Sequence, residues 1–560
     1  LHFSPAILVV HLDRLKMELP ALAGTIFAIV VVGCYLLESC FFLSKDPQEP
    51  EYFRPQVPLI GHFLGLNKYG AGRYFTKIGA QTRTKIFSAP IFNFKFYVIA
   101  ERKFIASIQR NAKTISFVPF AVKATQNLSG ATEKAAKLQD HLEGGPEAKE
   151  FDRIQRTTLA AGSDLDELSY VATQVKVDVI ERLVFDAAKS PDSATQIDLF
   201  AWVKHAVAIS STEGMFGPLN PFKNPDHEAD FWYAKTNALK FCDKAHILLG
   251  GGFIANLFAK EAVQARERNG QRYEEYIRLG GLEKASGLIK GRSRIMAENG
   301  VSQRDIARIN VGFDLAMLAN YVPTTWWAVF EIFSRPWLVE EIRKEVSKAV
   351  KKQENGDFTL DMSVIKSSSP LLLSSIQEAQ RLHIIHAQIR EVLRDTNITV
   401  GDTPHLLKKG NYVQINSIPI LRSEETWGAD ATSFDAYRFI KMKRKADVPG
   451  VATPGDLPPH SFPVWGVAPH ICPARWFATG GAMALIALMA LKLDIEATPD
   501  FKAEGPAGRE WRMPKVEGIF VALLSPGEPV PVVVRPRKGF EGKCSIETGT
   551  PGTRLQLSVG

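Results

Sequence analysis

The chain has 560 residues, 45% of them hydrophobic and 23% charged, which is enough to form one large domain or two ordinary ones. Its formal net charge is +8, but it contains no arginine-rich groove motif, zinc finger or aromatic platform, which argues against a nucleic acid partner. The five cysteines are odd in number and widely spaced, which is typical of a reducing compartment without a disulfide framework.

The N-terminal region contains an uncharged stretch, residues 19–37, which nearly reaches the length that a helix needs to cross a bilayer. We therefore expect a transmembrane anchor over residues 19–43, preceded by an N-terminal segment, residues 1–18, in which Met17 is a candidate start. A cleaved signal peptide is the alternative, although no clear small-residue cleavage site precedes Lys45.

After the anchor, residues 44–60 are rich in proline and predict a stiff, extended connector. The main domain is then expected over residues 61–538, and alternating apolar residues predict strands between Tyr69 and Ala100. The segment after Lys538 is rich in glycine and serine and predicts a flexible tail, residues 539–560.

Most of the domain has the apolar periodicity of helices. The longest expected helix, Ile306 to Phe333, is largely apolar and contains Pro323, which would leave the carbonyl of Ala319 without its helical partner. The other expected helices are Asp164 to Val184, Ala201 to Glu213, Tyr233 to Leu257 and Glu261 to Glu298.

Two short motifs follow this helix. Glu378 and Arg381 are three residues apart in a predicted helix and therefore share a face, an arrangement that usually marks a solvated surface pair. The second motif is the turn from Trp427 to Asp430 followed by the aromatic segment from Phe434 to Phe439, which contains Arg438.

The run from Trp465 to Arg475 is the most informative part of the chain. Gly466 and Pro469 shape a tight loop, and Pro473 suits the first turn of a helix, where its missing N–H has no cost. The helix that follows is expected over residues 474–493.

Cys472 lies in this loop near the expected helix start, where free N–H groups and the helix dipole favour a thiolate. A thiolate held in this way can serve as the fifth ligand of a haem iron in oxygen-activating enzymes, and His470 is placed to meet a haem propionate. The alternative is that Cys472 is an inert, buried cysteine.

The Glu378–Arg381 pair, the aromatic segment with Arg438 and the cysteine loop occur in an order and spacing that resembles the cytochrome P450 family. The resemblance covers roughly residues 47–538. It implies a cytochrome P450 fold, mainly α with small β-sheets (α+β), with a single N-terminal transmembrane helix.

The resemblance also implies roles for individual residues. Cys472 would be the axial ligand of haem b, shielded by Trp465, while His470 and Arg390 would contact a propionate. Glu378, Arg381 and Arg438 would form a buried charge network, which is tolerated only when carboxylate pairing compensates desolvation of the guanidinium groups. The loop departs from the family pattern at three positions: Trp465 stands where Phe is commoner, and Ala468 and Ala474 stand where Gly is commoner.

The long helix departs from the family further. Most oxygen-activating members carry an acid followed by Thr here, whereas this chain has Ala319-Asn320-Tyr321-Val322-Pro323-Thr324-Thr325-Trp326-Trp327. This arrangement looks like the branch that contains sterol 7α-hydroxylases, prostacyclin synthase and many fungal relatives. Asn320 and Thr324 would organise water and relay protons in catalysis.

The resemblance predicts a haem-thiolate monooxygenase that oxidises a lipophilic secondary metabolite such as a terpenoid or steroid. Electrons would come from NADPH through NADPH–cytochrome P450 reductase, with cytochrome b5 as a further candidate partner, at the endoplasmic reticulum membrane with a cytosolic catalytic domain. The expected substrate pocket is lined by Phe117, Tyr321, Ile384, Ile385 and residues 519–521.

Two other functions stay open. A haem-thiolate isomerase or dehydratase that acts on a peroxide would need no external electrons, and the missing acid favours it. A non-catalytic haem protein is the third class.

Overall fold

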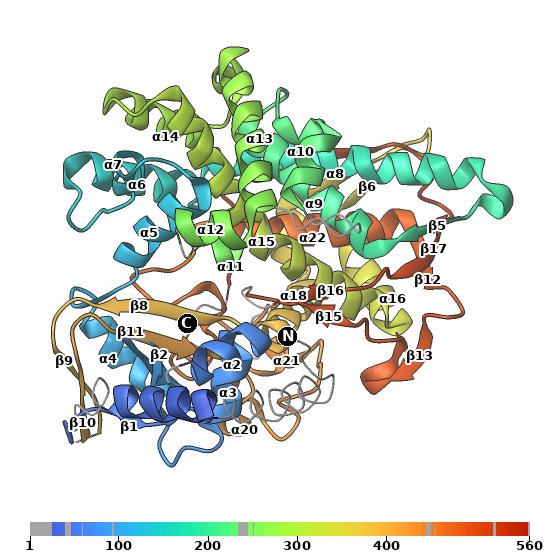
Figure 1. Ribbon diagram of the computed structural model, residues 1–560. Coiled ribbons are helices and arrows are strands. Elements are labelled where there is room, and N and C mark those ends of the chain that lie inside the picture. The colour runs from blue at the N-terminus through green and yellow to red at the C-terminus, as the bar shows by residue number, and fades with distance from the viewer. Residues whose placement is uncertain are drawn as a thin grey trace, which may run out of the picture.

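The computed structural model describes residues 25–39, 46–58, 60–91, 94–232, 245–249, 251–401, 403–443, 450–453, 455–518 and 522–557. Helices make up most of this part of the chain, and the strands form small sheets, as the resemblance predicted. The strands of the largest sheet gather at the lower left of Figure 1, and most of the longer helices lie above and to the right of them.

The largest sheet has six strands in the order β1-β2-β3-β11-β8-β4. β3 runs parallel to β11, and β11 runs antiparallel to β8, so that Val413 lies between Tyr97 and Arg390. Arg390 thereby occupies a fixed register in the sheet. The strands are β1 (Glu51–Tyr52), β2 (Ile86–Ile91), β3 (Phe94–Ile99), β4 (Ile115–Ser116), β8 (Ala387–Val392) and β11 (Tyr412–Asn416).

The helical part is built around α15 (Gln303–Phe333), a 31-residue helix that confirms the long helix expected from the sequence. The hydroxyl of Ser302 accepts a hydrogen bond from the backbone N–H of Asp305 and caps its start. The helix continues through Pro323. It packs against α9 (Leu199–Phe216), α13 (Lys260–Arg278), α18 (Pro370–His383) and α22 (Arg475–Lys492), and α8 (Ser163–Lys189) packs in turn on α9 and α22.

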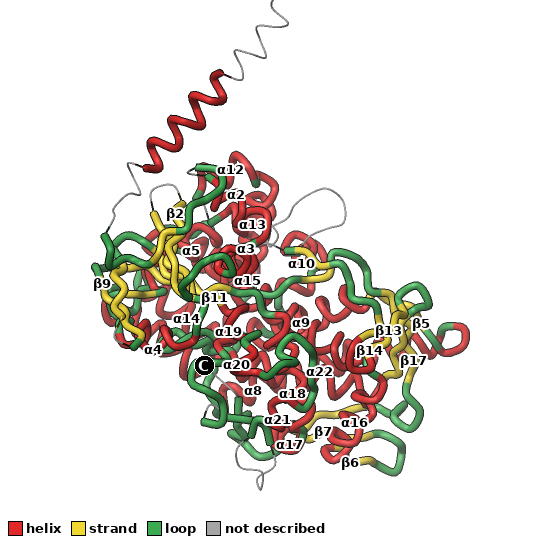
Figure 2. The backbone as a smooth tube through the Cα atoms, turned by 90° about the horizontal axis from the view of Figure 1, so that it is seen from below, coloured by secondary structure: helices red, strands yellow, loops and turns green. Residues whose placement is uncertain are grey.

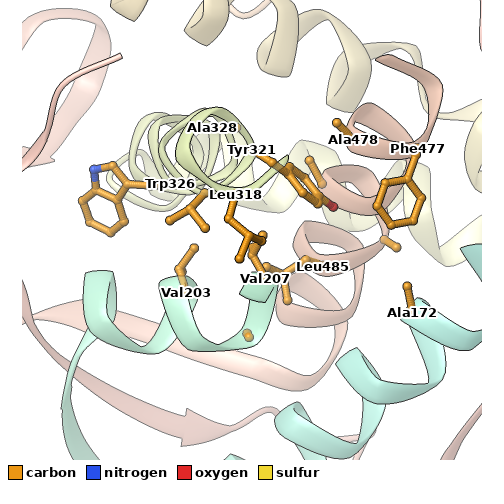
Figure 3. Close-up of a cluster of buried hydrophobic side chains, with 14 of the residues drawn as sticks. Ala172, Val203, Val207, Leu318, Tyr321, Trp326, Ala328, Phe477, Ala478 and Leu485 are labelled. Carbon is orange, nitrogen blue, oxygen red and sulfur yellow. The ribbon is translucent and has the colours of Figure 1, made fainter. Parts of the chain in front are cut away.

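The apolar core fills the space between these helices. Figure 3 shows Leu318 and Tyr321 of α15 beside Val207 of α9 and Leu485 of α22. All four side chains are almost fully buried. This packing fixes the rotation of α15 and therefore decides which of its residues remain exposed.

The remaining helices and strands are shorter and join these two parts. The helices are α2 (Gly61–Tyr69), α3 (Ala71–Gly79), α4 (Ile105–Arg110), α5 (Val118–Ser129), α6 (Glu133–Lys137), α7 (Gly145–Thr158), α10 (Pro225–Phe231), α11 (Ala245–Leu248), α12 (Gly252–Phe258), α14 (Gly287–Glu298), α16 (Pro336–Val346), α17 (Met362–Ser368), α19 (Ser417–Leu421), α20 (Glu424–Trp427) and α21 (Arg438–Lys441). The strands are β5 (Thr195–Asp198), β6 (Val350–Lys352), β7 (Phe358–Asp361), β9 (Thr396–Val400), β10 (Thr403–Leu407), β12 (Leu493–Ala497), β13 (Lys502–Gly505), β14 (Arg509–Trp511), β15 (Val516–Glu517), β16 (Ser525–Pro526), β17 (Pro531–Pro536) and β18 (Cys544–Glu547).

Several boundaries differ from the predictions. The strands expected between Tyr69 and Ala100 are β2 and β3, but α3 occupies the start of this region, because its apolar residues recur with helical rather than alternating spacing. The helix expected over residues 261–298 is two helices, α13 and α14, which are separated by a turn at Gly280, where φ is +77°. Most of the helix expected over residues 233–257 lies outside the described residues.

Within the described residues, none of the helices combines the length and the apolar character that crossing a bilayer requires. The transmembrane helix predicted over residues 19–43 is therefore not supported. Residues 25–39 form a helix that projects from the rest of the chain in Figure 2, and residues 19–24 and 40–43 lie outside the described part.

The C-terminal tail also differs from its prediction. β18 pairs in parallel with β7, although no ordered structure was expected after Lys538. Beyond it, the backbone N–H of Gly552 donates to Asp166 over 2.7 Å, and the carbonyl of Leu555 accepts a hydrogen bond from the indole N–H of Trp476. Leu555 and Leu557 are buried, so the tail packs as part of the domain.

Candidate active site

The loop before α22 folds back on itself and presents Cys472. The backbone N–H of Cys472 donates to the carbonyl of Trp465 over 2.7 Å. Gly466 has a φ of +91°, and a Cβ atom there would lie 2.7 Å from the carbonyl oxygen of His470. Only glycine fits this position without strain, which explains its place in the motif.

The helix itself begins at Arg475, with Ala474 as its N-cap, so Pro473 precedes the first turn instead of opening it. The guanidinium of Arg475 donates to the carbonyl of Cys472 over 2.9 Å and holds the end of the loop against the helix.

The protein alone does not favour a thiolate at Cys472. Burial raises the pKa of the Cys472 thiol, and the backbone N–H groups of Ala474 and Arg475, together with the Arg475 charge, only partly oppose this effect. The helix start therefore lowers the pKa of Cys472, as expected, but by less than burial raises it. A metal ion coordinated by the sulfur would supply the missing stabilisation, because it deprotonates its thiol ligand.

Arg390, which is buried, and His470, which is partly exposed, provide polar groups at the loop. Arg390 donates to the carbonyl of Val467 over 2.8 Å, and its Nε has no hydrogen-bond partner among the described residues. Burial lowers the pKa of Arg390 to about 10. The Nε2 atom of His470 likewise has no partner among them, and burial, with the charge of Arg390, lowers the pKa of His470 to about 4.

A buried guanidinium without an anionic partner is costly, so this pair fits a carboxylate that a ligand supplies. The propionate of a haem has this chemistry, and Cys472 provides the soft sulfur ligand that its iron takes. The residues present therefore fit haem, held by Cys472 at the iron and by Arg390 and His470 at a propionate. The indole of Trp465, which is partly exposed, belongs to the same loop.

Glu378, Arg381 and Arg438 form one buried network. Glu378 accepts two hydrogen bonds from Arg381, at 2.7 and 2.8 Å, and one from Arg438 at 2.9 Å. The side chains of Glu378 and Arg381 are fully buried, which excludes the surface-pair alternative. Arg381 also donates to the carbonyls of Leu421 and Ala431, so the network joins α18 to the segment that leads toward the cysteine loop.

Asp430 completes this network and was not singled out from the sequence. Its carboxylate accepts two hydrogen bonds from Arg438, both at 3.0 Å. Burial would lower the pKa of Arg438, but Asp430 and Glu378 together raise it above its usual value. The two acids therefore balance the two guanidinium charges.

In the middle of α15, two residues are exposed although most of the surrounding helix is buried or partly buried. Ala316 and Asn320, one turn apart, are exposed, and Thr324, a further turn along, is buried but not completely. Asp314, the carboxylate of α15 nearest in sequence to Asn320, lies in the core and accepts a hydrogen bond from Tyr273 over 2.7 Å. Asn320 is thus exposed and Thr324 slightly so, and their expected role in organising water stays a prediction.

The expected pocket residues are only partly brought together. Phe117 is exposed, and its ring lies 5.9 Å from that of His470. Tyr321 points away from the exposed face toward Phe477 of α22, because it follows Asn320 by about 100° around the helix (Figure 3). Tyr321 is therefore a core residue and not a pocket residue, whereas residues 519–521 lie outside the described part of the chain.

Comparison with known proteins gives the family. Residues 295–502 match the family model described as cytochrome P450. The chain is 30% identical to cytochrome P450 monooxygenase nodJ of Hypoxylon pulicicidum, over 96% of this chain and 99% of that protein. It is 25% identical to a cytochrome P450 monooxygenase of Gibberella zeae, over 93% and 91% of the two chains. A more distant match, 21% identical over 86% of this chain and 93% of the other, is 7-alpha-hydroxycholest-4-en-3-one 12-alpha-hydroxylase of Oryctolagus cuniculus.

The cysteine loop, the buried Glu378 network and a similarity that extends over nearly the whole length of both chains lead to one conclusion: the chain belongs to the cytochrome P450 family and is an oxidoreductase of the monooxygenase type.

Proposed function

We propose that the enzyme inserts one oxygen atom from O2 into a lipophilic secondary metabolite such as a terpenoid or steroid, with electrons from NADPH delivered by a reductase. The observation that carries the proposal is Cys472 in its Gly466 loop, beside a guanidinium and an imidazole that lack an anion within the described residues. The relatives named as fungal monooxygenases and sterol hydroxylases support the reaction class and the lipophilic substrate.

The residues of this chain have separate tasks in such a reaction. Bound haem b would supply the iron centre at which O2 is activated, and Cys472 would hold that iron. Arg390 and His470 would orient the group through its propionate. On the exposed face of α15, the amide of Asn320 can both donate and accept, and the hydroxyl of Thr324 can hold a water one turn away. These two side chains would replace the acid that most relatives use to deliver protons.

A second candidate is an isomerase or dehydratase that acts on a peroxide without external electrons. It is favoured by the position of Asp314, since this carboxylate is fully buried in the core and accepts a hydrogen bond from Tyr273. A reaction that needs no proton delivery would need no acid there.

Metabolite mass spectrometry on a strain from which the gene is deleted distinguishes the two candidates without a guess at the substrate. For a hydroxylase, the precursor that accumulates should be lighter than the lost product by one oxygen atom. Cell-free conversion of this precursor should require NADPH. Equal masses and turnover without NADPH would instead establish the isomerase.

We also infer that the enzyme works at a membrane surface, as the resemblance implies for the endoplasmic reticulum. The helix over residues 25–39 projects from the side where α2 and α12 lie (Figure 2), and all three expose large apolar side chains, such as Phe27, Phe63 and Phe253. Exposed apolar patches of this kind mark membrane or protein contacts.

Flotation with phosphatidylcholine vesicles tests this inference. We expect the full chain to float with the vesicles, and the double variant Phe253→Ser/Leu257→Ser to bind them more weakly, because both residues are exposed on α12. A chain that stays at the bottom of the gradient with or without the substitutions would contradict a membrane location.

A further inference from the structure

The exposed face of α15 ends at Trp327. This residue follows Asn320 by seven positions, two helical turns, and therefore lies on the same face as Ala316 and Asn320. Ala316 and Asn320 are exposed, whereas Trp327 is only 2% exposed. Thr324, which lies between Asn320 and Trp327, is 8% exposed, so the open face narrows at Thr324 and is covered at Trp327.

His383, the last residue of α18, provides the cover. Its ring stacks on the indole of Trp327 with centroids 3.7 Å apart and planes 5° from parallel. The Nε2 atom of His383 is 2.6 Å from a carboxylate oxygen of Glu331, whose other oxygen accepts a hydrogen bond from Arg335. Glu331 lies one turn beyond Trp327 on α15, so the same helix supplies the indole and the group that orients the imidazole.

The indole also holds a chain segment from the C-terminal part of the domain. Its N–H donates to the carbonyl of Leu524 over 2.8 Å. This segment pairs with the residues after α18: Ile384 forms a β-bridge with Leu523, and the backbone N–H of Ile385 donates to the carbonyl of Ala522. Two segments distant in sequence therefore meet at the Trp327–His383 stack.

We propose that the Trp327–His383 stack is the end wall of the substrate cavity and determines which part of the substrate reaches the reactive centre. This inference rests on the proposed oxidation at Cys472. The wall closes the exposed face of α15 two turns from Asn320, and through Leu524 and Ile384 it fixes the two segments that border that end. The two residues are positioning residues, because they would set the shape of the cavity without contacting the reacting atoms.

The neighbouring Trp326 offers a matched control. It is fully buried, its indole N–H has no partner among the described residues, and its ring packs against Phe200 of α9 at 5.3 Å. Figure 3 shows it beside α9, the helix that carries Val203 and Val207. Because Trp326 follows Asn320 by six positions, it lies on a different side of α15. Phe at either position keeps an aromatic ring, but only Trp327→Phe removes a hydrogen bond that the structure makes.

The test expresses wild type, Trp327→Phe and Trp326→Phe in the deletion strain and measures the ratio of isomeric products. We expect Trp327→Phe to change the ratio by about fivefold, the effect of one lost hydrogen bond on the competition between substrate orientations. Trp326→Phe should retain the wild-type ratio. His383→Ala, which removes the stacked ring, should shift the ratio in the same direction as Trp327→Phe.

A second readout needs no substrate. Imidazole reports on the iron centre alone, whereas 4-phenylimidazole also fills the cavity, so the ratio of their spectral binding constants measures cavity shape. Trp327→Phe should change this ratio and Trp326→Phe should not. If the two variants gave identical ratios, for products and for ligands, the proposal that the Trp327–His383 stack forms the end wall would be wrong. If the wild type forms no oxidised product, the proposed function is wrong. The ligand ratio then still tests whether the Trp327–His383 stack shapes the cavity.

Discussion

Replacing Cys472 by serine is expected to abolish turnover while the fold is retained. A hydroxyl cannot supply the electron-rich sulfur ligand that favours cleavage of the O–O bond. The backbone at this position is fixed by its own hydrogen bond to Trp465 and by the Gly466 turn, neither of which involves the sulfur. We therefore expect an unchanged thermal unfolding midpoint of the protein part, an altered carbon monoxide difference spectrum and no product.

Cys34→Ser is the control for this change. Cys34 lies in the helix over residues 25–39, far along the chain from the cysteine loop, and it is partly exposed. This variant should keep both the spectrum and the product. If instead Cys472→Ser leaves the cellular metabolite profile intact, the chain acts as a haem carrier or sensor, and its catalytic assignment is wrong.

Replacing Glu378 by glutamine should strongly destabilise the domain. The substitution leaves Arg381 fully buried without the one carboxylate that it pairs with among the described residues, and within the same residues Arg438 keeps Asp430. Removing one partner of a buried ion pair costs about 3–5 kcal/mol, a large share of the stability of a typical domain. Urea unfolding followed by circular dichroism should show a markedly lower midpoint, and little of the variant should accumulate in cells.

The matched control is Glu150→Gln. Glu150 also pairs with an arginine three residues along a helix, Arg153, but both side chains are exposed. Because both side chains are exposed, water hydrates the charge of Arg153 when its partner is lost, so the urea midpoint of unfolding should not change measurably. Equal shifts in the two variants would show that burial of the Glu378 network contributes little to stability.

Features that depend on local pattern could be predicted from the sequence. The long helix α15 and the cysteine loop each follow from neighbouring residues: apolar periodicity in the first case, and the glycine, proline and cysteine spacing in the second. The Glu378–Arg381 pair could be placed on one helix face, but its burial depends on α21 and the segment around Asp430, which lie more than 50 residues further on.

Features that depend on distant contacts could not be predicted. β18 forms because it pairs with β7, almost 190 residues earlier, and no local pattern specifies that pairing. The stack of Trp327 on His383 likewise joins two helices that carry no common signal. The prediction that Tyr321 lines the substrate pocket was wrong for a different reason. Consecutive residues of a helix point about 100° apart, so the sequence alone could have shown that Tyr321 and Asn320 face different directions.

The packed tail has a consequence for how the gene can be altered. Leu555 contacts the helix that starts three residues after Cys472, through the indole of Trp476, and Arg554 stacks on the same indole at 4.6 Å. A stop codon placed before Arg554 would therefore remove part of the support for the loop that carries Cys472. The codons for Arg554 and Leu555 therefore belong to the folded domain, and an expression plasmid that stops before them would shorten the packed part of the chain.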